Sequence, residues 1–275
     1  MATPSHLSIK PTKGWHLIDF KELIAYRDLF YFLVLRDIKV RYKQTVFGGL
    51  WAIIQPLFLM FVFTLFFGRL VKVPSDGVPY PIFSYSAMIV WTYFANVVTR
   101  SGNSLIQESA LISKVYFPRL IAPLAPVVAA LLDFAIAFVV LIGMMLYYRI
   151  YPTVMVVFVP VLVILTMLAA SGVGMFLAAL NVKYRDIGAA IPLLVQLWMF
   201  ASPIIYPISI LPEKYRLIYV LNPMAGVIEG FRSALLGTVA FPTGMVLVSA
   251  LVSIVLFLIG ALYFKRTERY FADVI

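Results

Sequence analysis

Long apolar stretches alternate with short polar segments along most of the chain. Five of these stretches contain no Asp, Glu, Lys or Arg, and a sixth is interrupted only by Asp133. A helix rises 1.5 Å per residue, so about 20 residues cross a hydrocarbon core of roughly 30 Å. The pattern predicts six membrane-spanning helices, over Thr45–Gly68, Pro81–Thr99, Leu120–Tyr148, Val154–Leu180, Ile187–Ile210 and Thr243–Phe264.

Basic residues fall mainly on one side of this predicted bundle. Sixteen of the 22 Lys and Arg residues lie in four places. They come before the first span, between the second and third spans, between the fourth and fifth spans, or after the last span. Cytoplasmic segments carry an excess of Lys and Arg. We therefore expect a multi-pass protein of the cytoplasmic (inner) membrane with both termini in the cytosol.

The region before the first span has two parts. Trp15–Val34 alternates apolar and polar residues at helical spacing, and Leu23, Phe30 and Leu33 or Val34 share one face. Such a helix is expected to lie in the membrane interface, and a solvated helix is the alternative. A collar of four basic residues follows, which sets topology and suits contacts to anionic lipid headgroups: Arg36, Lys39, Arg41 and Lys43.

The connection between the second and third spans is too long for a tight turn. Its sequence, SLIQESALISKVYFPRLIAP over Ser104–Pro123, contains apolar residues that suggest a short helix. Such residues need cover from lipid or protein. The segment is either a docking element for a soluble cytosolic partner or a helix that lies flat on its own bundle.

The segment Met199–Leu236 contains broken apolar runs before the last span. Three prolines between Pro203 and Pro212 prevent one regular helix, and Asn222-Pro223 breaks the following run. Short broken helices at membrane depth are tolerated where they are buried in protein or line a cavity. We interpret the segment as a helical hairpin dipping into the outer half of the membrane, with an ordinary surface loop as the alternative. Glu229 and Arg232 are three residues apart and can pair.

Asp133 is the one carboxylate inside a predicted span. A charge at the bilayer centre costs about 2.5–3.5 kcal/mol on insertion scales, so Asp133 should face protein or water. We interpret it as a packing or channel-lining acid, since proton coupling usually needs several intramembrane ionisable groups. Small residues four apart allow close helix approach, within one subunit or at a dimer seam: Ala170, Gly174 and Ala178, and then Gly226, Gly230 and Ala234.

Composition and motifs exclude several classes of function. The chain is 63% hydrophobic and 12% charged, with a net charge of +10. Its basic residues lie between long apolar runs and do not form one polar face, so no nucleic-acid partner is predicted. It contains no cysteine and no GxxxxGK[ST], HExxH or GxSxG motif. We expect no enzymatic activity, no metal site and no cofactor bound by this chain. Aromatic side chains near amides, such as Trp51 and Gln55, suit sugar rings.

Four segments together resemble one known family. They are RDIKVRYKQTVFGGLWAIIQPL, LISKVYFPRLIAP, NVKYRDI, and SPIIYP with LNPMAGVIEGFR. In this order they are similar to the permease subunits of ABC-type polysaccharide exporters (type 2 ABC permeases), which export O-antigen and teichoic acid. The resemblance covers roughly residues 29–265, nearly the whole chain.

The resemblance implies an all-α membrane fold and an assembly. Residues 1–44 would be a cytosolic tail and amphipathic gate helix, 45–265 the six-span permease domain, and 266–275 a cytosolic C-terminal tail. Such permeases are homodimers that pass a lipid-linked polysaccharide through a channel between the two copies. Two copies of a cytosolic ABC ATPase subunit bind ATP and Mg²⁺ and supply the energy.

The resemblance also implies roles for particular residues. The coupling helix, about 105–119, would contact the ATPase through Leu105, Glu108, Ile112, Lys114, Tyr116, Phe117 and Arg119. The outer gate helices, about 207–236, would include Glu229 and Arg232. Residues that would line the channel are Trp51, Gln55, Phe58, Tyr85, Trp198 and Tyr206. Cations at the cytosolic mouth would meet the phosphates of the lipid carrier: Arg36, Lys39, Arg41 and Lys43.

Other functions fit the sequence less well. A secondary transporter would need coupling carboxylates, and only Asp133 is available. A membrane glycosyltransferase would need polar catalytic clusters in its loops, which are short here. The serious alternative is a type 2 ABC permease that exports a lipid or a drug, since it would share the architecture and differ in its channel lining.

Overall fold

The computed structural model describes residues 20–43, 48–184, 186–237, 239–268 and 271, and every regular element within them is a helix. Two helices precede the bundle, α1 (Phe20–Ala25) and α2 (Arg27–Lys43). The long helices follow, interleaved with short ones: α3 (Trp51–Phe63), α4 (Tyr80–Gln107), α5 (Ser109–Ile112), α6 (Ile121–Tyr148), α7 (Val159–Lys183), α8 (Asp186–Phe200), α9 (Glu213–Val220), α10 (Pro223–Leu236) and α11 (Thr243–Thr267).

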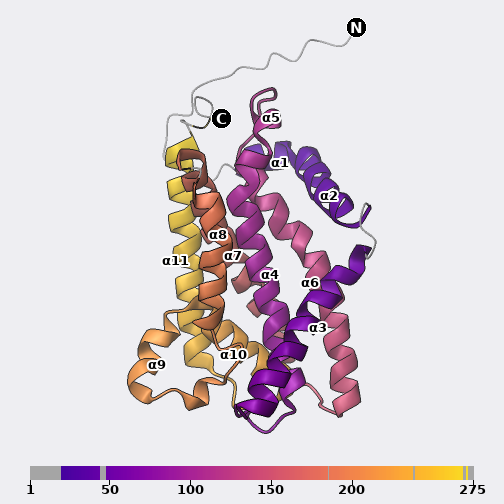
Figure 1. Cartoon of the computed structure of the whole chain (residues 1–275). Helices are drawn as coiled ribbons and strands as arrows, with labels where there is room; N and C mark the ends of the chain where they lie inside the picture. The colour runs from indigo at the N-terminus through magenta and orange to yellow at the C-terminus, as the bar shows by residue number, and fades with distance from the viewer. Residues whose placement is uncertain (1–19, 44–47, 185, 238, 269–270, 272–275) are drawn as a thin grey trace.

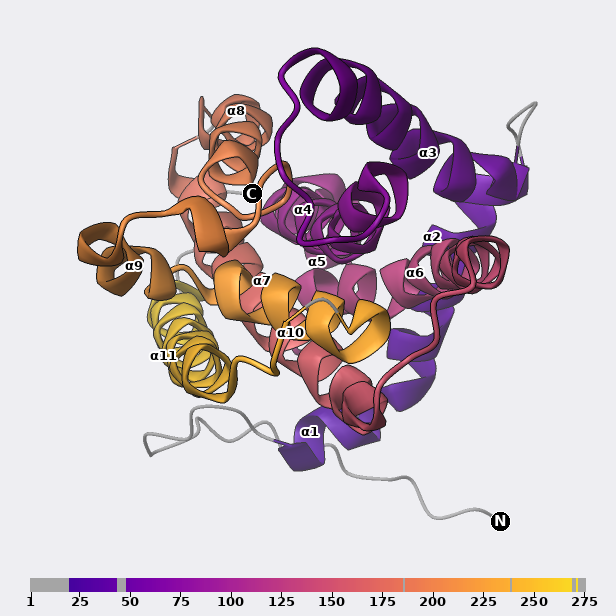
Figure 2. The ribbon, with the colours of Figure 1, turned by 90° about the horizontal axis from the view of Figure 1, so that it is seen from below.

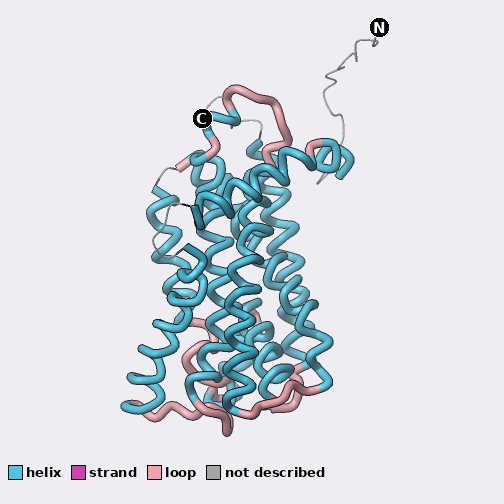
Figure 3. Tube along the Cα trace, turned by 90° about the vertical axis from the view of Figure 1, so that its right-hand side faces the viewer, coloured by secondary structure: helices cyan, strands magenta, loops and turns pink. Residues whose placement is uncertain are grey.

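Five helical runs are long and apolar enough to cross a membrane, and one shorter apolar helix accompanies them among the described residues. The five runs are Trp51–Leu70, Tyr80–Gln107, Ile121–Tyr148, Val154–Lys183 and Thr243–Thr267, and the shorter helix is α8. They run side by side, with α5 at one end of the bundle and α9 and α10 at the other (Figures 1 and 3). The prediction of an all-helical membrane protein is confirmed for the described residues.

Helix α4 occupies the centre of the bundle. It contacts α3, α6, α7, α8 and α10, and a view along the bundle shows α3, α6 and α8 around it (Figure 2). Its serines and tyrosines are buried with their hydroxyls donating to nearby carbonyls, as Ser101 does to Pro123 O at 2.6 Å. Buried polar groups need such partners, so this helix is suited to protein contact on nearly all sides.

Small residues allow the close helix crossings. A Cβ on Gly260 of α11 would lie 2.0 Å from the carbonyl oxygen of Gly172 of α7, and one on Gly174 would lie 2.5 Å from Ser101 Cβ of α4. Gly226 of α10 meets Met245 of α11 in the same way. These small residues therefore serve helix packing within one chain. Of the two interpretations, packing within one subunit and a dimer seam, the structure favours the first for these residues.

Two predicted spans differ from the observed helices in where they end. The helix of the second span continues beyond the predicted end at Thr99, because α4 runs to Gln107 with its turns after Arg100 packed against α7. The predicted fifth span, Ile187–Ile210, ends as a helix at Phe200, and a turn follows that contains Pro203 and Pro207. These prolines cannot donate to a preceding turn of helix.

The N-terminal amphipathic helix is also longer than predicted. Its described part runs as α1 and α2 to Lys43, so the basic collar lies on α2 and not at the head of the first span. The first 19 residues and residues 44–47 lie outside the described ranges. Helices α1 and α2 lie across the α5 end of the bundle (Figure 1), and the predicted apolar face packs on α6 through Leu33 and Val34.

The outer segment contains two helices, as a hairpin requires. Helix α9 ends at Val220 and α10 begins at Pro223, with the side chain of Asn222 capping the backbone N–H of Met224 at 3.1 Å. Every residue of α10 is buried. The alternative interpretation as a surface loop is therefore wrong.

Candidate functional site

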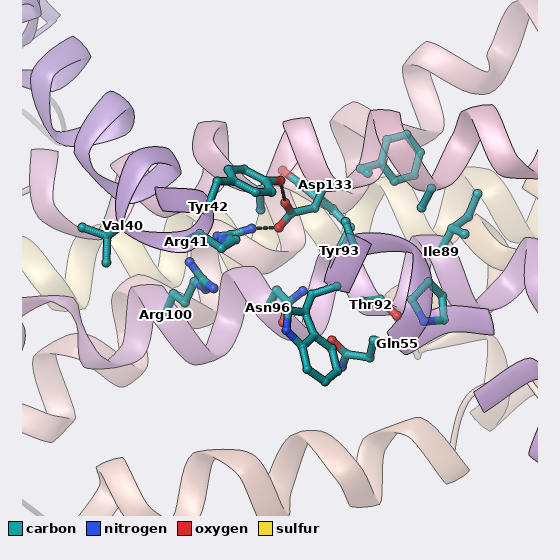
Figure 4. Close-up of a pocket in the computed structure, with 16 residues that line it drawn as sticks. Val40, Arg41, Tyr42, Gln55, Ile89, Thr92, Tyr93, Asn96, Arg100 and Asp133 are labelled. Carbon is teal, nitrogen blue, oxygen red and sulfur yellow. Dashed lines mark hydrogen bonds and ion pairs between the residues drawn. The ribbon is translucent and has the colours of Figure 1, made fainter. Parts of the chain in front are cut away.

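A cavity of about 310 Å³ opens between α2, α3, α4 and α6. It lies where the last turn of α2 meets the side of the bundle, and polar side chains from each of these helices line it (Figure 4). Its polar and aromatic lining comprises Arg41, Tyr42, Trp51, Gln55, Thr92, Tyr93, Asn96, Arg100, Asp133 and Phe134. Charged groups, amides and aromatic rings therefore meet at this opening.

Asp133 anchors the end of α2 to α6. Arg41 forms an ion pair with its carboxylate, and the hydroxyl of Tyr42 donates a hydrogen bond to the same group. The side chains of Arg41 and Asp133 are each only 14% exposed. The prediction that Asp133 faces protein or water is confirmed, because its charge is compensated and it borders the cavity.

Arg100 points toward the same cluster from α4 (Figure 4). Within the described residues, no carboxylate forms an ion pair with it. Burial, and secondarily repulsion from Arg100, lowers the pKa of Arg41 to about 10, which leaves the guanidinium of Arg41 charged at neutral pH. Arg41 is therefore paired with Asp133, and Arg100 is a second cation that lines the same cavity.

The uncharged lining suits a hydroxylated ligand. Gln55 and Asn96 present amide groups from α3 and α4, and Thr92 adds a hydroxyl (Figure 4). Trp51 lines the cavity and is 51% exposed, so its indole is accessible from outside. Tyr93 donates its hydroxyl to Val127 O at 2.9 Å, which leaves its ring as the lining surface.

A second ion pair connects α2 to the end of α4. Arg36 binds both carboxylate oxygens of Glu108, one of them at 2.7 Å, and also contacts Asp37 at 2.8 Å. Glu108 lies between α4 and α5. A two-point arginine–carboxylate contact fixes orientation as well as distance. It raises the pKa of Arg36 above its usual range, because hydrogen bonding by Glu108 favours the charged form.

The predicted coupling segment divides into exposed and buried parts. The separate helix is only α5, Ser109–Ile112, and it is followed by exposed residues at positions 113–116, among which Tyr116 is 70% exposed. Leu105 and Phe117 are buried, at 1% and 3% exposure, so the prediction that they contact a partner is wrong for this conformation. Arg119 donates to Glu268 O at the end of α11.

Two predicted coupling residues have intermediate positions. Glu108 is engaged by Arg36, and Ile112 packs partly against the apolar cluster beneath α2. Lys114 is exposed. Of the predicted coupling residues, Lys114 and Tyr116 are therefore the exposed ones in the described conformation.

The predicted channel-lining residues do not form one surface. Trp51, Gln55 and Phe58 are exposed on α3. Tyr85 is fully buried, and its hydroxyl donates to Ala137 O at 3.1 Å, so its prediction as a lining residue is wrong for this conformation. Trp198 packs against Phe94 with ring centroids 5.1 Å apart.

The remaining two aromatics of that prediction hold the outer segment together. Trp198 Nε1 donates to Asn222 Oδ1 at 3.0 Å, and Tyr206 accepts from the hydroxyl of Tyr219 at 3.0 Å. Both are partly buried. Their polar atoms are used within the chain, between the end of α8 and the α9–α10 turn.

Glu229 and Arg232 pair as predicted, with Arg232 Nη1 3.2 Å from Glu229 Oε1. Both are buried, and Arg232 also donates to Phe83 O and Ile204 O, at 3.2 and 2.8 Å. Its guanidinium lies 3.6 Å from the centroid of the Phe83 ring. The pair is therefore enclosed by protein.

Sequence reasoning missed Arg100, Tyr42 and Asn96 as cavity residues. Arg100 directly follows the apolar run Pro81–Thr99, and a charge in that position is typical of the end of a span. Asn181, in the NVKYRD segment, was also missed: its side chain contacts Gly102 O at 3.0 Å and accepts from Gly188 N at 2.9 Å, which joins α4, α7 and α8. Within the described residues, no group of three His, Cys, Asp or Glu could hold a metal ion.

The sequence profile of ABC-2 type transporters matches residues 28–236, which is most of the chain. The chain belongs to the ABC-2 type transporter family. The matched region of this family begins at the second residue of α2 and ends with α10, so it contains the cavity, α5 and the outer helices.

Curated relatives align along nearly their whole length. The chain is 28% identical to the O-antigen export system permease protein RfbA of Myxococcus xanthus, over 92% of this chain and 97% of that protein. It is 27% identical to RfbA of Klebsiella pneumoniae, over 90% and 95%. It is 25% identical to the polysialic acid transport protein KpsM of Escherichia coli, over 86% and 92%.

Proposed function

We propose that this ABC-2 family protein is the membrane-spanning subunit of an exporter that moves a lipid-linked polysaccharide out of the cytosol. The observation that carries the proposal is its end-to-end similarity to two kinds of polysaccharide permease, for O-antigen and for polysialic acid. The cavity lining of Trp51, Gln55 and Asn96 supports it, since aromatic faces and amides together suit sugar rings. The chain itself is not an enzyme in this proposal.

The proposed topology has six crossings with both termini in the cytosol. The α5 end of the bundle is the cytosolic end, in line with the excess of Lys and Arg there. Helix α8 has 15 residues and is about 22 Å long, short of the roughly 30 Å hydrocarbon core. The turn after Phe200 completes this crossing, with α9 and α10 on the outer side.

Energy comes from a separate ATPase in this proposal. The sequence has no GxxxxGK[ST] phosphate-binding loop, so a partner subunit binds ATP and Mg²⁺. Its docking surface is α5 with the exposed residues that follow, Lys114, Val115 and Tyr116. Val115 and Tyr116 are apolar or aromatic side chains held at the end of the bundle, where a soluble partner can bury them.

Two copies of the chain form the channel between them. The exposed aromatic surface of α3, with Trp51 and Phe58, and the exposed apolar surface of α8, with Leu193 and Leu197, are the proposed channel or dimer faces. Numerous weak aromatic contacts suit a sliding polymer, because each can be released at small cost.

Deletion and reconstitution test this function. Deleting the gene should leave lipid-linked glycan in the cytosol and remove it from the cell surface, and the intact gene should restore export. A type 2 permease for a drug or simple lipid would leave the surface polysaccharide unchanged. ATP hydrolysis by the purified chain without any partner would contradict the division of labour.

A further inference from the structure

The cavity between α2, α3, α4 and α6 has an unbalanced charge. Arg41, Arg100 and Asp133 are its charged lining residues, so two cations meet one anion. Asp133 is already engaged by both Arg41 and Tyr42. Like charges at close range in a low-dielectric site repel, and an added anion between them would relieve that repulsion.

Neighbouring carboxylates do not supply this anion. Asp37 acts on Arg100 electrostatically but is hydrogen-bonded to Arg36, at 2.8 Å. Glu108 is held by the same arginine through both of its oxygens. The carboxylates nearest to the cavity are therefore committed to other cations in the described structure.

We propose that the cavity binds a phosphate group that is attached to a lipid and adjoins a sugar, with Arg100 as its principal contact. Asp133 is the internal counterion that occupies Arg41 until the phosphate arrives. This inference rests on the proposed function, in which the substrate is a lipid-linked polysaccharide. It moves the phosphate contact from the exposed basic residues of α2 to a side chain of α4.

The chemistry of the lining selects this ligand. A guanidinium can donate two parallel hydrogen bonds to phosphate oxygens, which a carboxylate-engaged arginine cannot do as readily. Gln55 and Asn96 supply neutral donors and acceptors for hydroxyl groups, and Trp51 an aromatic face. A volume of about 310 Å³ accommodates a headgroup and not a polymer, so the cavity recognises the junction between lipid and glycan.

The location also favours a lipid-attached ligand. The cavity lies beneath the last turn of α2, a helix placed across the end of the bundle, and its rim carries the exposed Trp51. Tryptophan is typical of the membrane–water interface, where headgroups lie. A lipid tail could remain in the bilayer beside α3 while its phosphate enters the cavity.

Binding by the full-length protein in phosphatidylcholine nanodiscs tests the proposal. Three probes are titrated: a polyprenyl diphosphate carrying one sugar, phosphatidylglycerol, and inorganic pyrophosphate. Arg100→Gln should weaken binding of the sugar-carrying diphosphate about tenfold or more, as loss of a charge-assisted hydrogen bond predicts. Arg100→Lys should recover part of the affinity, and Lys183→Gln, at an exposed position of α7, is the matched control.

Asp133→Asn gives a result that a purely structural role would not produce. This substitution removes the one anion that lines the cavity and leaves both of its cations, so the diphosphate should bind several-fold more tightly. Weaker binding in this variant would overturn the role of Asp133 as a counterion. Thermal melting of each variant, and the partial rescue by Arg100→Lys, separate a binding defect from misfolding.

The three probes show whether the bound phosphate belongs to the exported substrate or to a membrane lipid, and whether the site exists at all. A loss specific to the sugar-carrying diphosphate assigns the site to the exported substrate. An equal loss for phosphatidylglycerol assigns the same anion site to membrane lipid, and unchanged binding of all three probes overturns it. Polysaccharide export is measured in parallel: export by Arg100→Gln at the normal rate, with normal binding, would reject this site and leave the exporter function intact.

Discussion

Two groups of buried charge show different designs within one chain. At the α10 end, Glu229 and Arg232 form a matched pair, and Arg232 also satisfies two backbone carbonyls and stacks on Phe83. At the α2 end, Arg41 pairs with Asp133 beside an open cavity, and Arg100 is a second cation that lines the same cavity. In the first group each charged side chain has an oppositely charged partner. In the second group, Arg100 has no ion-pair partner among the described residues. Charge matching thus separates a packing element from a candidate binding site more clearly than burial does.

The largest effect is expected from breaking the matched pair. Arg232→Met leaves Glu229 buried without its cation and removes donors from two carbonyls, which should cost about 3–5 kcal/mol of stability. Thermal unfolding of the purified protein in detergent measures the loss. A melting temperature equal to that of the wild type would contradict the enclosed, fully used arrangement of Arg232.

A smaller effect is expected at Asp133. Asp133→Asn keeps the shape but removes the charge that compensates Arg41, and the hydrogen bond from Tyr42 weakens, for a loss of about 1–3 kcal/mol. The cost should be below that of Arg232→Met because the cavity admits water. The two melting curves, recorded under the same conditions, rank the variants, and the reverse order would break the comparison.

The Arg36–Glu108 pair should contribute less again. Its arginine side chain is 35% exposed, so Glu108→Gln should cost about 1 kcal/mol or less, with a larger effect at low salt. Exchanging the two charges, as Arg36→Glu with Glu108→Arg, should restore part of the loss seen in either single reversal. Melting temperatures of Arg36→Glu, Glu108→Arg and the double variant, at low and high salt, give the coupling energy between the two side chains. If the effects of the two single reversals simply add in the double variant, the pair contributes nothing to stability.

The smallest change in stability is expected at Arg100. Arg100→Gln removes a cation that has no paired carboxylate among the described residues and that repels Arg41, so stability should be unchanged or slightly higher. Thermal melting beside Arg232→Met is the measurement. A loss as large as that of Arg232→Met would show that Arg100 belongs to the packing and would remove the contrast between the two groups.

The spans could be predicted because lipid imposes a local rule on sequence. Long apolar runs, of which only the third is interrupted by a charge at Asp133, predicted α3, α6, α7 and α11, since an unsatisfied or charged group at that depth is costly. The predicted helix ends were wrong where a helix is surrounded by protein and not by lipid. Arg100 looked like the end of a span, but α4 continues beyond it because its next turns pack on other helices.

The site was predictable only in part. Trp51, Gln55, Arg41 and Asp133 each stood out in the sequence as residues with a function, because each is unusual in or beside an apolar run. Their meeting at one cavity was not predictable, since Asp133 lies more than 90 positions after Tyr42, to which it is joined. Contacts of that kind depend on how the helices cross, and no local pattern encodes the crossing.

Helix α4 is unbroken from Tyr80 to Gln107. Arg100 therefore stands two turns, about 12 Å, from Glu108 at the junction with α5. A stiff rod of this kind has no joint at which a displacement could be absorbed. In the proposed exporter, a displacement of α5 by the ATPase would therefore tilt Arg100 as well. Binding of an anion in the cavity and movement of the ATPase would then be coupled through the one helix.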